Sequence, residues 1–326
     1  MQLYEGEIGK MKWVILKIKE NSMFLMLLGL VVFSYLLLHD LVGGTLFLHE
    51  SLDSYTIQAL AWRKGEVFLA NGQDYPWLEL AIYNGRYFVS FPPIPTIFML
   101  PLTVFFGEET PNTLMVAIYT LAAFIGSYHA CLALRMKHYY ACFWAVFATF
   151  ACNLLEISTN GGVWLQAQTL NFAFLIWAVD CILRDRWVIC CIFLVLAVGC
   201  RPLSAIYIPV ALILFLLKES NNSSGVKTKR QLGKLLGSLT VIAVGAAGYM
   251  WYNYIRFDNV FEFGHNYLPE FTSSDAGQFS LRYFSNNFYN IMCRPIRFLP
   301  NGKLEFPLYN GFMFYIANPI FIVLFL

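Results

Sequence analysis

Long apolar runs separated by short polar segments dominate this sequence. A helix needs about 20 apolar residues to cross a bilayer, with about 17 as a lower limit. Backbone groups inside a bilayer must bond within their own segment, so each crossing run should be helical. The pattern therefore predicts an all-α membrane protein, a multi-pass bundle of transmembrane helices. The runs are Ser22–His39, Phe91–Phe106, Leu114–Leu134, Tyr139–Leu155, Trp164–Leu183, Trp187–Cys200, Leu203–Leu217, Leu235–Tyr254 and Phe312–Leu326.

The run Phe91–Phe106 is too short for an easy crossing, and the basic residues decide its placement. Cytoplasmic loops carry an excess of Lys and Arg. If this run crossed, the loop with Arg135 and Lys137 would fall outside. If it does not cross, all basic segments fall inside together with the N-terminus. We therefore expect Phe91–Phe106 to lie on, or dip into, the outer face. The other basic residues of the segments expected inside are Lys10, Lys12, Lys17, Lys19, Arg184, Arg186, Lys218, Lys227, Lys229, Arg230 and Lys234.

This topology gathers the polar sequence on the non-cytoplasmic side. We expect one domain over residues 1–326, with a first outer loop at 40–113, a cytoplasmic linker at 218–234 and a second long outer loop at 256–311. Fourteen of the twenty acidic residues fall in the segments expected outside. The expected location is the cell membrane, with the active site on the outer face.

Composition agrees with a membrane protein. The chain is 58% hydrophobic and 13% charged, whereas soluble domains are about 25% charged. A net charge of +2 without a basic stripe gives no reason to expect nucleic acid as a partner. The sequence has no C-x-x-C pair, P-loop or G-x-G-x-x-G pattern. Most of the eight cysteines lie inside apolar runs, which favours buried free thiols.

Ser51–Lys64 in the first outer loop has the pattern of an amphipathic surface helix. Leu52, Tyr55, Ala59 and Trp62 form its apolar stripe. Asp53 could favour the helix dipole with Ser51 as the cap. It could also act as a general base that takes a proton from an acceptor hydroxyl. Glu50 and Asp40 are alternatives for that base.

Arginine and aromatic residues at the ends of the predicted helices are further candidates. Arg201, in "AVGCRPLSAIY", is either a snorkelling anchor or a phosphate ligand. Arg256 is open to the same two interpretations, and His265 is either a loop histidine or a ligand. Trp164 and Gln166 are either an aromatic belt with a helix cap or part of a binding site. Asp180 is expected to pair with Arg184 one turn later.

The segment "LDSYTIQALAWRKGEVFL…ELAIYNGRYFVSFPPIP" resembles the first outer loop of the GT-C superfamily of membrane glycosyltransferases. It is most similar to bacterial proteins of glycosyltransferase family 39, relatives of the protein mannosyltransferases and of the aminoarabinose transferase of lipid A. The similarity continues through "GGVWLQAQ", "LAVGCRPLSAIYIPVAL" and "YNYIRFDNVFEFGHNYLP". It extends in order from Asp40 to about Leu268.

The resemblance implies a transmembrane bundle with juxtamembrane helices in a large first outer loop. It implies transfer, with inversion, of a sugar from a polyprenyl-phosphate carrier to a lipid, glycan or protein acceptor. By position Asp53 or Glu50 would be the base beside Tyr55, and Arg201 would meet the carrier phosphate, with help from Arg256. Trp164 and Gln166 would line the cavity. Some relatives use a divalent cation such as Mg²⁺ or Mn²⁺, but no metal site is evident in the sequence.

The sequence also departs from this family. Relatives often have a Lys before their prolines, whereas Ser90 and Phe91 precede Pro92 here, and Arg86 could replace that Lys. Relatives often have the acid four residues before the matched Tyr, at the position of Ser51. They also continue with more crossings after the point where this chain ends. A lipid or sugar transporter or flippase, and a non-catalytic assembly protein of the same fold, are the alternative functions.

Overall fold

The computed structural model describes residues 2–41, 45–220, 229–272, 276–277, 280–305 and 311–325. It is mostly helical. The chain separates into two compact units, residues 1–264 and 265–326. Their boundary lies inside the expected second outer loop.

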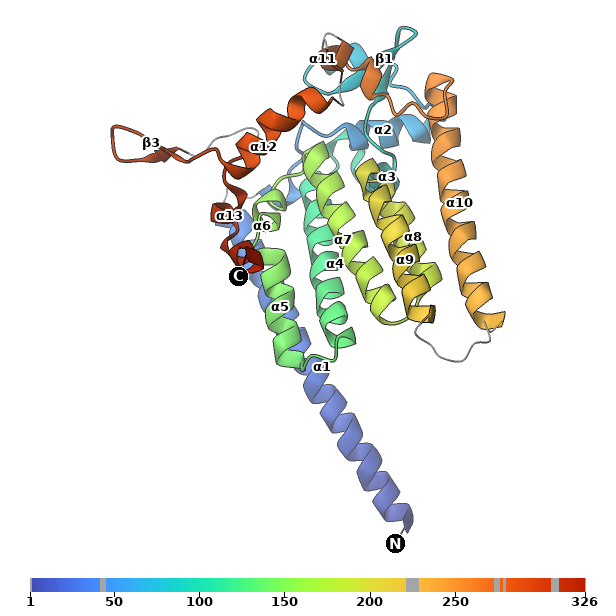
Figure 1. Cartoon of the computed structure of the whole chain (residues 1–326), viewed down its shortest axis with the longest axis vertical. Helices are drawn as coiled ribbons and strands as arrows, with labels where there is room; N and C mark the ends of the chain where they lie inside the picture. Colours follow the sequence, from blue (N-terminus) through green and yellow to red (C-terminus); the bar gives the residue numbers. More distant parts are fainter. Residues whose placement is uncertain are drawn as a thin grey trace. The chain divides into compact units, whose positions relative to one another are not determined.

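The first unit contains the helices and one hairpin (Figure 1). Short 3-10 turns lie at Thr45–Phe47 (η1), Gly72–Asp74 (η2), Gly107–Glu109 (η3) and Pro202–Ile206 (η4). The helices are α1 (Gln2–Leu41), α2 (Ser54–Arg63), α3 (Ile94–Phe106), α4 (Asn112–Ala133), α5 (His138–Phe150), α6 (Leu154–Ile157), α7 (Val163–Leu183), α8 (Trp187–Val198), α9 (Tyr207–Ser220) and α10 (Lys229–Phe257), and the strands are β1 (Leu80–Tyr83) and β2 (Arg86–Val89).

Four segments of the described chain are long and apolar enough to cross a membrane: Ser22–Leu41, Asn112–Ala133, Val163–Leu183 and Gln231–Phe257. Trp187–Val198 and Pro202–Lys218 are apolar but shorter. The prediction of a helical protein with several possible membrane spans is thus confirmed at this level.

Helix α4 lies inside the bundle, with α5 on one side and α7 on the other, and α8 follows beyond α7 (Figure 1). Small residues allow the close approach of α4 and α7. A Cβ atom added at Gly126 would lie 3.0 Å from the side chains of Ile176 and Trp177. The buried core between these helices fixes their ends, which carry the polar residues.

Helix α3 returns to the end of the bundle at which it started. Its first residue, Ile94, donates its backbone N–H to the Gly199 carbonyl at the end of α8 (3.0 Å). Its last residues lead through η3 to the start of α4. The start of α4 and the end of α8 lie at the same end of the bundle (Figure 1). Both ends of α3 therefore lie at this end of the bundle, and whether Phe91–Phe106 crosses a membrane stays a prediction.

The first outer loop is not purely helical, which corrects the all-α expectation for this segment. Strands β1 and β2 pair antiparallel, with Leu80 opposite Val89 and Tyr83 opposite Arg86. Asn84 and Gly85 connect them with φ of 50° and 73°. Two left-handed residues form the tight hairpin turn that matches strand twist, and Asn-Gly is its strongest sequence signal.

The second unit contains short elements. They are η5 (His265–Tyr267), α11 (Pro269–Thr272), η6 (Leu281–Tyr283), α12 (Phe284–Met292), β3 (Arg297–Phe298), β4 (Leu304–Glu305), α13 (Phe314–Ala317) and η7 (Pro319–Phe325). The apolar run expected at 312–326 therefore forms two short helical pieces and no long helix in its described part. Asn318 separates these pieces and Pro319 begins the second, and proline lacks the N–H that a continuous helix would use.

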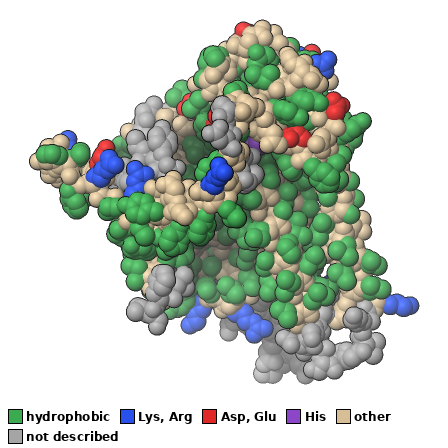
Figure 2. Space-filling view, turned by 45° about the horizontal axis from the view of Figure 1, so that its top comes forward, with side chains coloured by type: hydrophobic (Ala, Val, Ile, Leu, Met, Phe, Trp, Pro, Cys, Tyr) green, Lys and Arg blue, Asp and Glu red, His purple; other side chains and the backbone are tan. Residues whose placement is uncertain are grey.

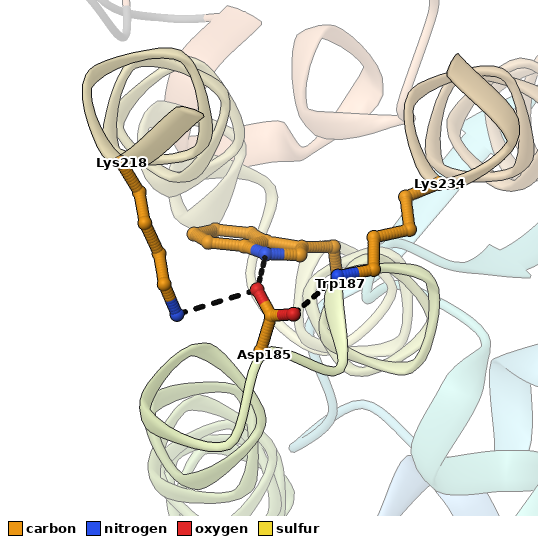
Figure 3. A network of polar contacts seen from close by, with 4 residues as sticks. All are labelled: Asp185, Trp187, Lys218 and Lys234. Atoms are coloured by element: carbon orange, nitrogen blue, oxygen red, sulfur yellow. Dashed lines mark hydrogen bonds and ion pairs between the residues drawn. The ribbon is translucent and has the colours of Figure 1, made fainter. Parts of the chain in front are cut away.

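The turn between α7 and α8 holds the ends of α9 and α10 (Figure 3). Asp185 has a φ of 63°, a left-handed conformation in which glycine is usual. Its carboxylate accepts hydrogen bonds from Trp187 Nε1 (2.7 Å) and from Lys234. Lys218 at the end of α9 forms an ion pair with the same carboxylate at 3.3 Å. One carboxylate thus joins three helices at the end that carries the basic residues.

These cations set the pKa of Asp185. Burial alone would raise the pKa. The hydrogen bonds from Lys234 and Trp187 and the charge of Lys218 outweigh that effect and lower the pKa to about 2.

We predict that Asp185→Asn lowers stability in a pH-dependent way. Asn tolerates the left-handed backbone and still accepts from Trp187, but it carries no charge. A carboxyl whose folded pKa of about 2 lies below the unfolded value of about 3.9 stabilises the fold above pH 4. That stability is lost as the pH falls from about 4 toward 2. We expect the variant to lose about 1 kcal/mol at neutral pH. Thermal unfolding in detergent should show that the difference in stability between the variant and the parent becomes smaller at about pH 3. A difference in stability that does not change with pH would contradict this ionic explanation.

Candidate functional site

Asp53 begins α2 and is almost fully buried, with 2% of its surface exposed. Its Oδ1 accepts from the Tyr55 backbone N–H (2.9 Å), which makes Asp53 the N-cap. The helix was expected to begin near Ser51 with that residue as the cap. It begins at Ser54 instead, because the capping carboxylate is held in place from several sides.

Side chains from two other helices reach the same carboxylate. Gln166 on α7 donates to Oδ1 at 2.8 Å, and Asn112 on α4 donates to Oδ2 at 3.1 Å. Thr56 also donates to Oδ2, at 2.5 Å. A carboxylate has about four acceptor positions, and these donors occupy them. Asp53 therefore joins α2, α4 and α7.

Burial raises the pKa of the Asp53 carboxyl, while hydrogen bonds from Thr56, Asn112 and Tyr55 act in the opposite direction. An incoming acceptor hydroxyl would have to displace one of the donors to reach either oxygen. The geometry favours Asp53 as the residue that organises the site over Asp53 as the base.

Asn112 shapes the segment before α2. Its Nδ2 donates to the Glu50 carbonyl and its Oδ1 accepts from the Glu50 N–H, both at 2.9 Å. Gly161 packs against this amide: an added Cβ would lie 2.1 Å from Asn112 Oδ1. Glycine is required at 161 for this approach. The pair holds the backbone of Glu50 in place.

Glu50 is half-buried and its carboxylate is only partly engaged. Oε2 accepts from Asn160 Nδ2 at 3.1 Å, and Oε1 accepts from the Leu52 N–H at 3.4 Å. Asp40, in contrast, is exposed in the last turn of α1. Of the three predicted carboxylates, Glu50 combines proximity to the Asp53 junction with acceptor capacity that remains open.

Arg201 follows α8 and points toward the first turn of α7. Its Nη2 donates to the Trp164 carbonyl at 2.7 Å. Its Nε is buried and has no hydrogen-bond partner. Trp164 in turn donates from Nε1 to Glu79 at 3.2 Å. The Phe91 ring contacts both Trp164 and Tyr55. Arg201, Trp164 and Tyr55 are thus brought together.

Several other buried polar atoms near Arg201 also lack a partner. They include the Tyr55 and Tyr119 hydroxyls and Gln166 Oε1. Burial raises the pKa of Tyr55 well above its usual range, and Arg201 is close enough to favour the ionised form of that side chain. Each unsatisfied buried group costs about 1–3 kcal/mol. These atoms leave hydrogen-bonding capacity at the junction that the described chain does not use.

The remaining predicted residues lie apart from this junction. Arg256 is 4% exposed, donates to the Val89 carbonyl at 2.8 Å and lies over the Tyr252 ring. This geometry favours a structural role that attaches α10 to β2. Arg86 is exposed on the hairpin, over the Phe68 ring. His265 belongs to the second unit, where its ring contacts Phe271.

Sequence reasoning missed Asn112, Thr56 and Tyr119. Asn112 starts an apolar run directly after Pro111, which is a signal for a helix start and not for a site. Its partner Asp53 is 59 positions away. Thr56 is one of several polar residues of the predicted amphipathic helix, and Tyr119 lies inside an apolar run, so neither hydroxyl has a distinguishing pattern.

No group of three or more His, Cys, Asp or Glu suited to a metal ion occurs among the residues the structure describes. A pocket of about 110 Å³ beside α2, lined by Lys64, Glu66, Asn71, Tyr75 and Glu108 among others, contains none of the predicted site residues.

Comparison with known proteins gives no match to a family model, to a curated protein or to a solved structure.

We predict that Asp53→Asn and Glu50→Gln affect stability very differently. A carboxamide places two N–H donors where one Asp53 oxygen now accepts two hydrogen bonds, so donors would face donors. We expect Asp53→Asn to lower the free energy of unfolding by about 2–3 kcal/mol. Glu50→Gln, at a half-buried position, should stay within about 0.5 kcal/mol of the parent. Denaturant or thermal unfolding in detergent measures both, and equal losses would contradict the organising role of Asp53.

Proposed function

We propose that this chain is a membrane glycosyltransferase of the GT-C type. It moves a sugar from a polyprenyl-phosphate carrier to a lipid, glycan or protein acceptor at the outer face of the cell membrane. The observation that supports this best is the buried, unpartnered Nε of Arg201 beside Tyr55. A cation near membrane depth is costly unless it meets an anion or a wet cavity. A phosphate held at the bilayer surface by its hydrocarbon tail is such an anion.

Arg201 is the ligand for the carrier phosphate. Its hydrogen bond to the Trp164 carbonyl fixes one nitrogen and leaves the buried Nε without a partner. The planar guanidinium suits phosphate oxygens because two parallel N–H groups can donate at once. As the sugar leaves, negative charge develops on the carrier phosphate, and a fixed cation there stabilises the transition state.

Glu50 is the general base. Asn112 holds its backbone, and its carboxylate retains open acceptor positions. It takes the proton of the acceptor hydroxyl, whose oxygen attacks the anomeric carbon. The bond from that carbon to the carrier phosphate oxygen breaks, so the configuration inverts.

The candidate site lies at one end of the first unit, and the basic turns with Arg135, Lys137, Arg184 and Arg186 lie at the other end (Figure 1). Lys and Arg side chains lie along the lower edge of Figure 2. The excess of Lys and Arg supports a cytoplasmic basic end and an outward-facing site. Labelling of cysteines at Glu108 and Lys137 with an impermeant thiol reagent tests this orientation, since only the first should react from outside.

We predict that Arg201→Ala weakens binding of the donor. Loss of a hydrogen bond to a charged group costs about 1.5–3 kcal/mol, or about 10- to 150-fold in affinity. The donor affinity of Arg201→Lys should lie between those of the parent and of Arg201→Ala, because lysine keeps the charge but lacks the planar guanidinium. The measurement is binding of a panel of labelled polyprenyl-phosphate sugars to the purified protein in detergent.

Lys64→Ala is the matched control, because Lys64 is an exposed cation at the end of α2 and has no contact with Trp164 or Arg201 among the hydrogen bonds of the described chain. If the parent binds a donor and Arg201→Ala binds it equally well, Arg201 is only an anchor. If the parent binds none of the panel, the donor class itself is wrong.

We predict that Glu50→Gln lowers sugar transfer by about 100-fold or more while donor binding is unchanged, since a general base contributes about 10²–10⁴-fold. Asp40→Asn should transfer at the parent rate. The assay is sugar release from the donor that the parent binds. Parent-like transfer by Glu50→Gln would exclude it as the base.

A further inference from the structure

Helix α5 presents an uncovered aromatic face. Tyr139, Tyr140, Phe143 and Trp144 are 51%, 52%, 58% and 40% exposed. Residues four apart lie on the same side of a helix, so Tyr139 lies above Phe143 and Tyr140 lies above Trp144. The Trp144 ring contacts the rings of Phe143 (5.3 Å) and Phe147 (5.4 Å). The opposite face, with Ala141 and Ala145, is buried against α1 and α4.

A basic turn immediately precedes this face. Arg135 and Lys137 are exposed in the connection between α4 and α5. Within the part of the chain that the structure describes, neither takes part in an ion pair. Arg184 of α7 is nearby, because its Nη2 donates to the His129 carbonyl in the last turns of α4 (2.9 Å). The acid beside it, Asp180, is already paired with Arg184 at 2.7 Å.

Arg135 has a left-handed backbone, with φ of 62°. The backbone N–H of Met136 donates to the Cys131 carbonyl, and the backbone N–H of Arg135 donates to the Leu132 carbonyl. This is the helix ending at which glycine is usual, and a larger residue costs about 1–2 kcal/mol there. Arg135 therefore occupies a position at which the backbone conformation alone would favour glycine.

We infer that the α4–α5 turn and the outward face of α5 bind an anionic phospholipid. The phosphodiester headgroup lies at Arg135 and Lys137, and an acyl chain lies along Tyr140, Phe143 and Trp144. Aromatic rings are favoured at headgroup level, and basic residues beside a membrane helix attract anionic lipid. Helix α5 has 13 residues, so it is about 20 Å long. It leaves room at its end for a headgroup within the bilayer thickness.

The two halves of the surface select the ligand. A zwitterionic lipid would bring its own cation toward Arg135 and Lys137, and among the side chains that the structure describes there, Asp180 is already paired with Arg184. A soluble phosphate would leave the aromatic rings exposed. This site is separate from the Asp53 junction, and the inference depends neither on the proposed transferase activity nor on the orientation in the membrane.

The test is a lipid titration of the purified protein in neutral maltoside detergent, followed by thermal unfolding. A ligand that binds only the folded state raises Tm with its concentration. We expect saturable stabilisation by phosphatidylglycerol and little by phosphatidylcholine or glycerol 3-phosphate. The double variant Arg135→Gln with Lys137→Gln should bind phosphatidylglycerol at least tenfold more weakly. The control double variant, Lys64→Gln with Lys229→Gln, removes two exposed cations and should bind like the parent.

A second variant tests the chain contact. Phe143→Ser lies on the exposed face, so its Tm without lipid should stay close to that of the parent while its lipid affinity falls. Equal stabilisation by phosphatidylcholine, or equal losses in both double variants, would overturn the inference. Stabilisation by glycerol 3-phosphate alone would also overturn it. So would disulfide crosslinking of Phe143→Cys between two copies, because a second chain would then cover this face.

Discussion

The burial of one carboxylate constrains the whole polar end of this protein. Taking Asp53 out of water is costly unless hydrogen bonds replace its hydration. The donors come from its own helix, from Asn112 on α4 and from Gln166 on α7. The helices α4 and α7 must therefore start at the same level, and α2 must lie across their starts. Glu50 and Trp164, which flank this junction, take their positions from it.

At the opposite end of the first unit a carboxylate also joins several helices, but cationic side chains surround it there. There the acid, Asp185, is partly exposed and two lysines surround it. Between the two ends the helices pack through small and apolar residues that carry no chemistry. Around the Asp53 junction the described chain keeps buried polar atoms without partners, whereas Asp180 and Asp185 at the basic end are paired.

The apolar pattern was sufficient to predict the main helices, because each one satisfies its backbone internally. Trp164–Leu183 was expected and Val163–Leu183 is found; the expected Asp180–Arg184 pair forms at 2.7 Å. Prediction from local sequence was wrong where contacts between distant segments determine the structure. Ser51 and Asp53 are both good caps, and only the donors on α4 and α7 select Asp53. The turn at Asn84–Gly85 was visible, but the pairing of its strands was not included in the all-helical expectation. Nothing in the sequence near Asn112 indicates a partner 59 positions earlier.

The contact between Gly161 and Asn112 has a consequence for the history of this sequence. Any side chain at 161 would occupy the space of the Asn112 amide, with a Cβ only 2.1 Å from its oxygen. Loss of that amide would in turn remove a donor from the buried carboxylate of Asp53. In descendants of a common ancestor these positions should be inherited together or replaced together, and a lineage that gains a side chain at 161 should also carry a smaller residue at 112.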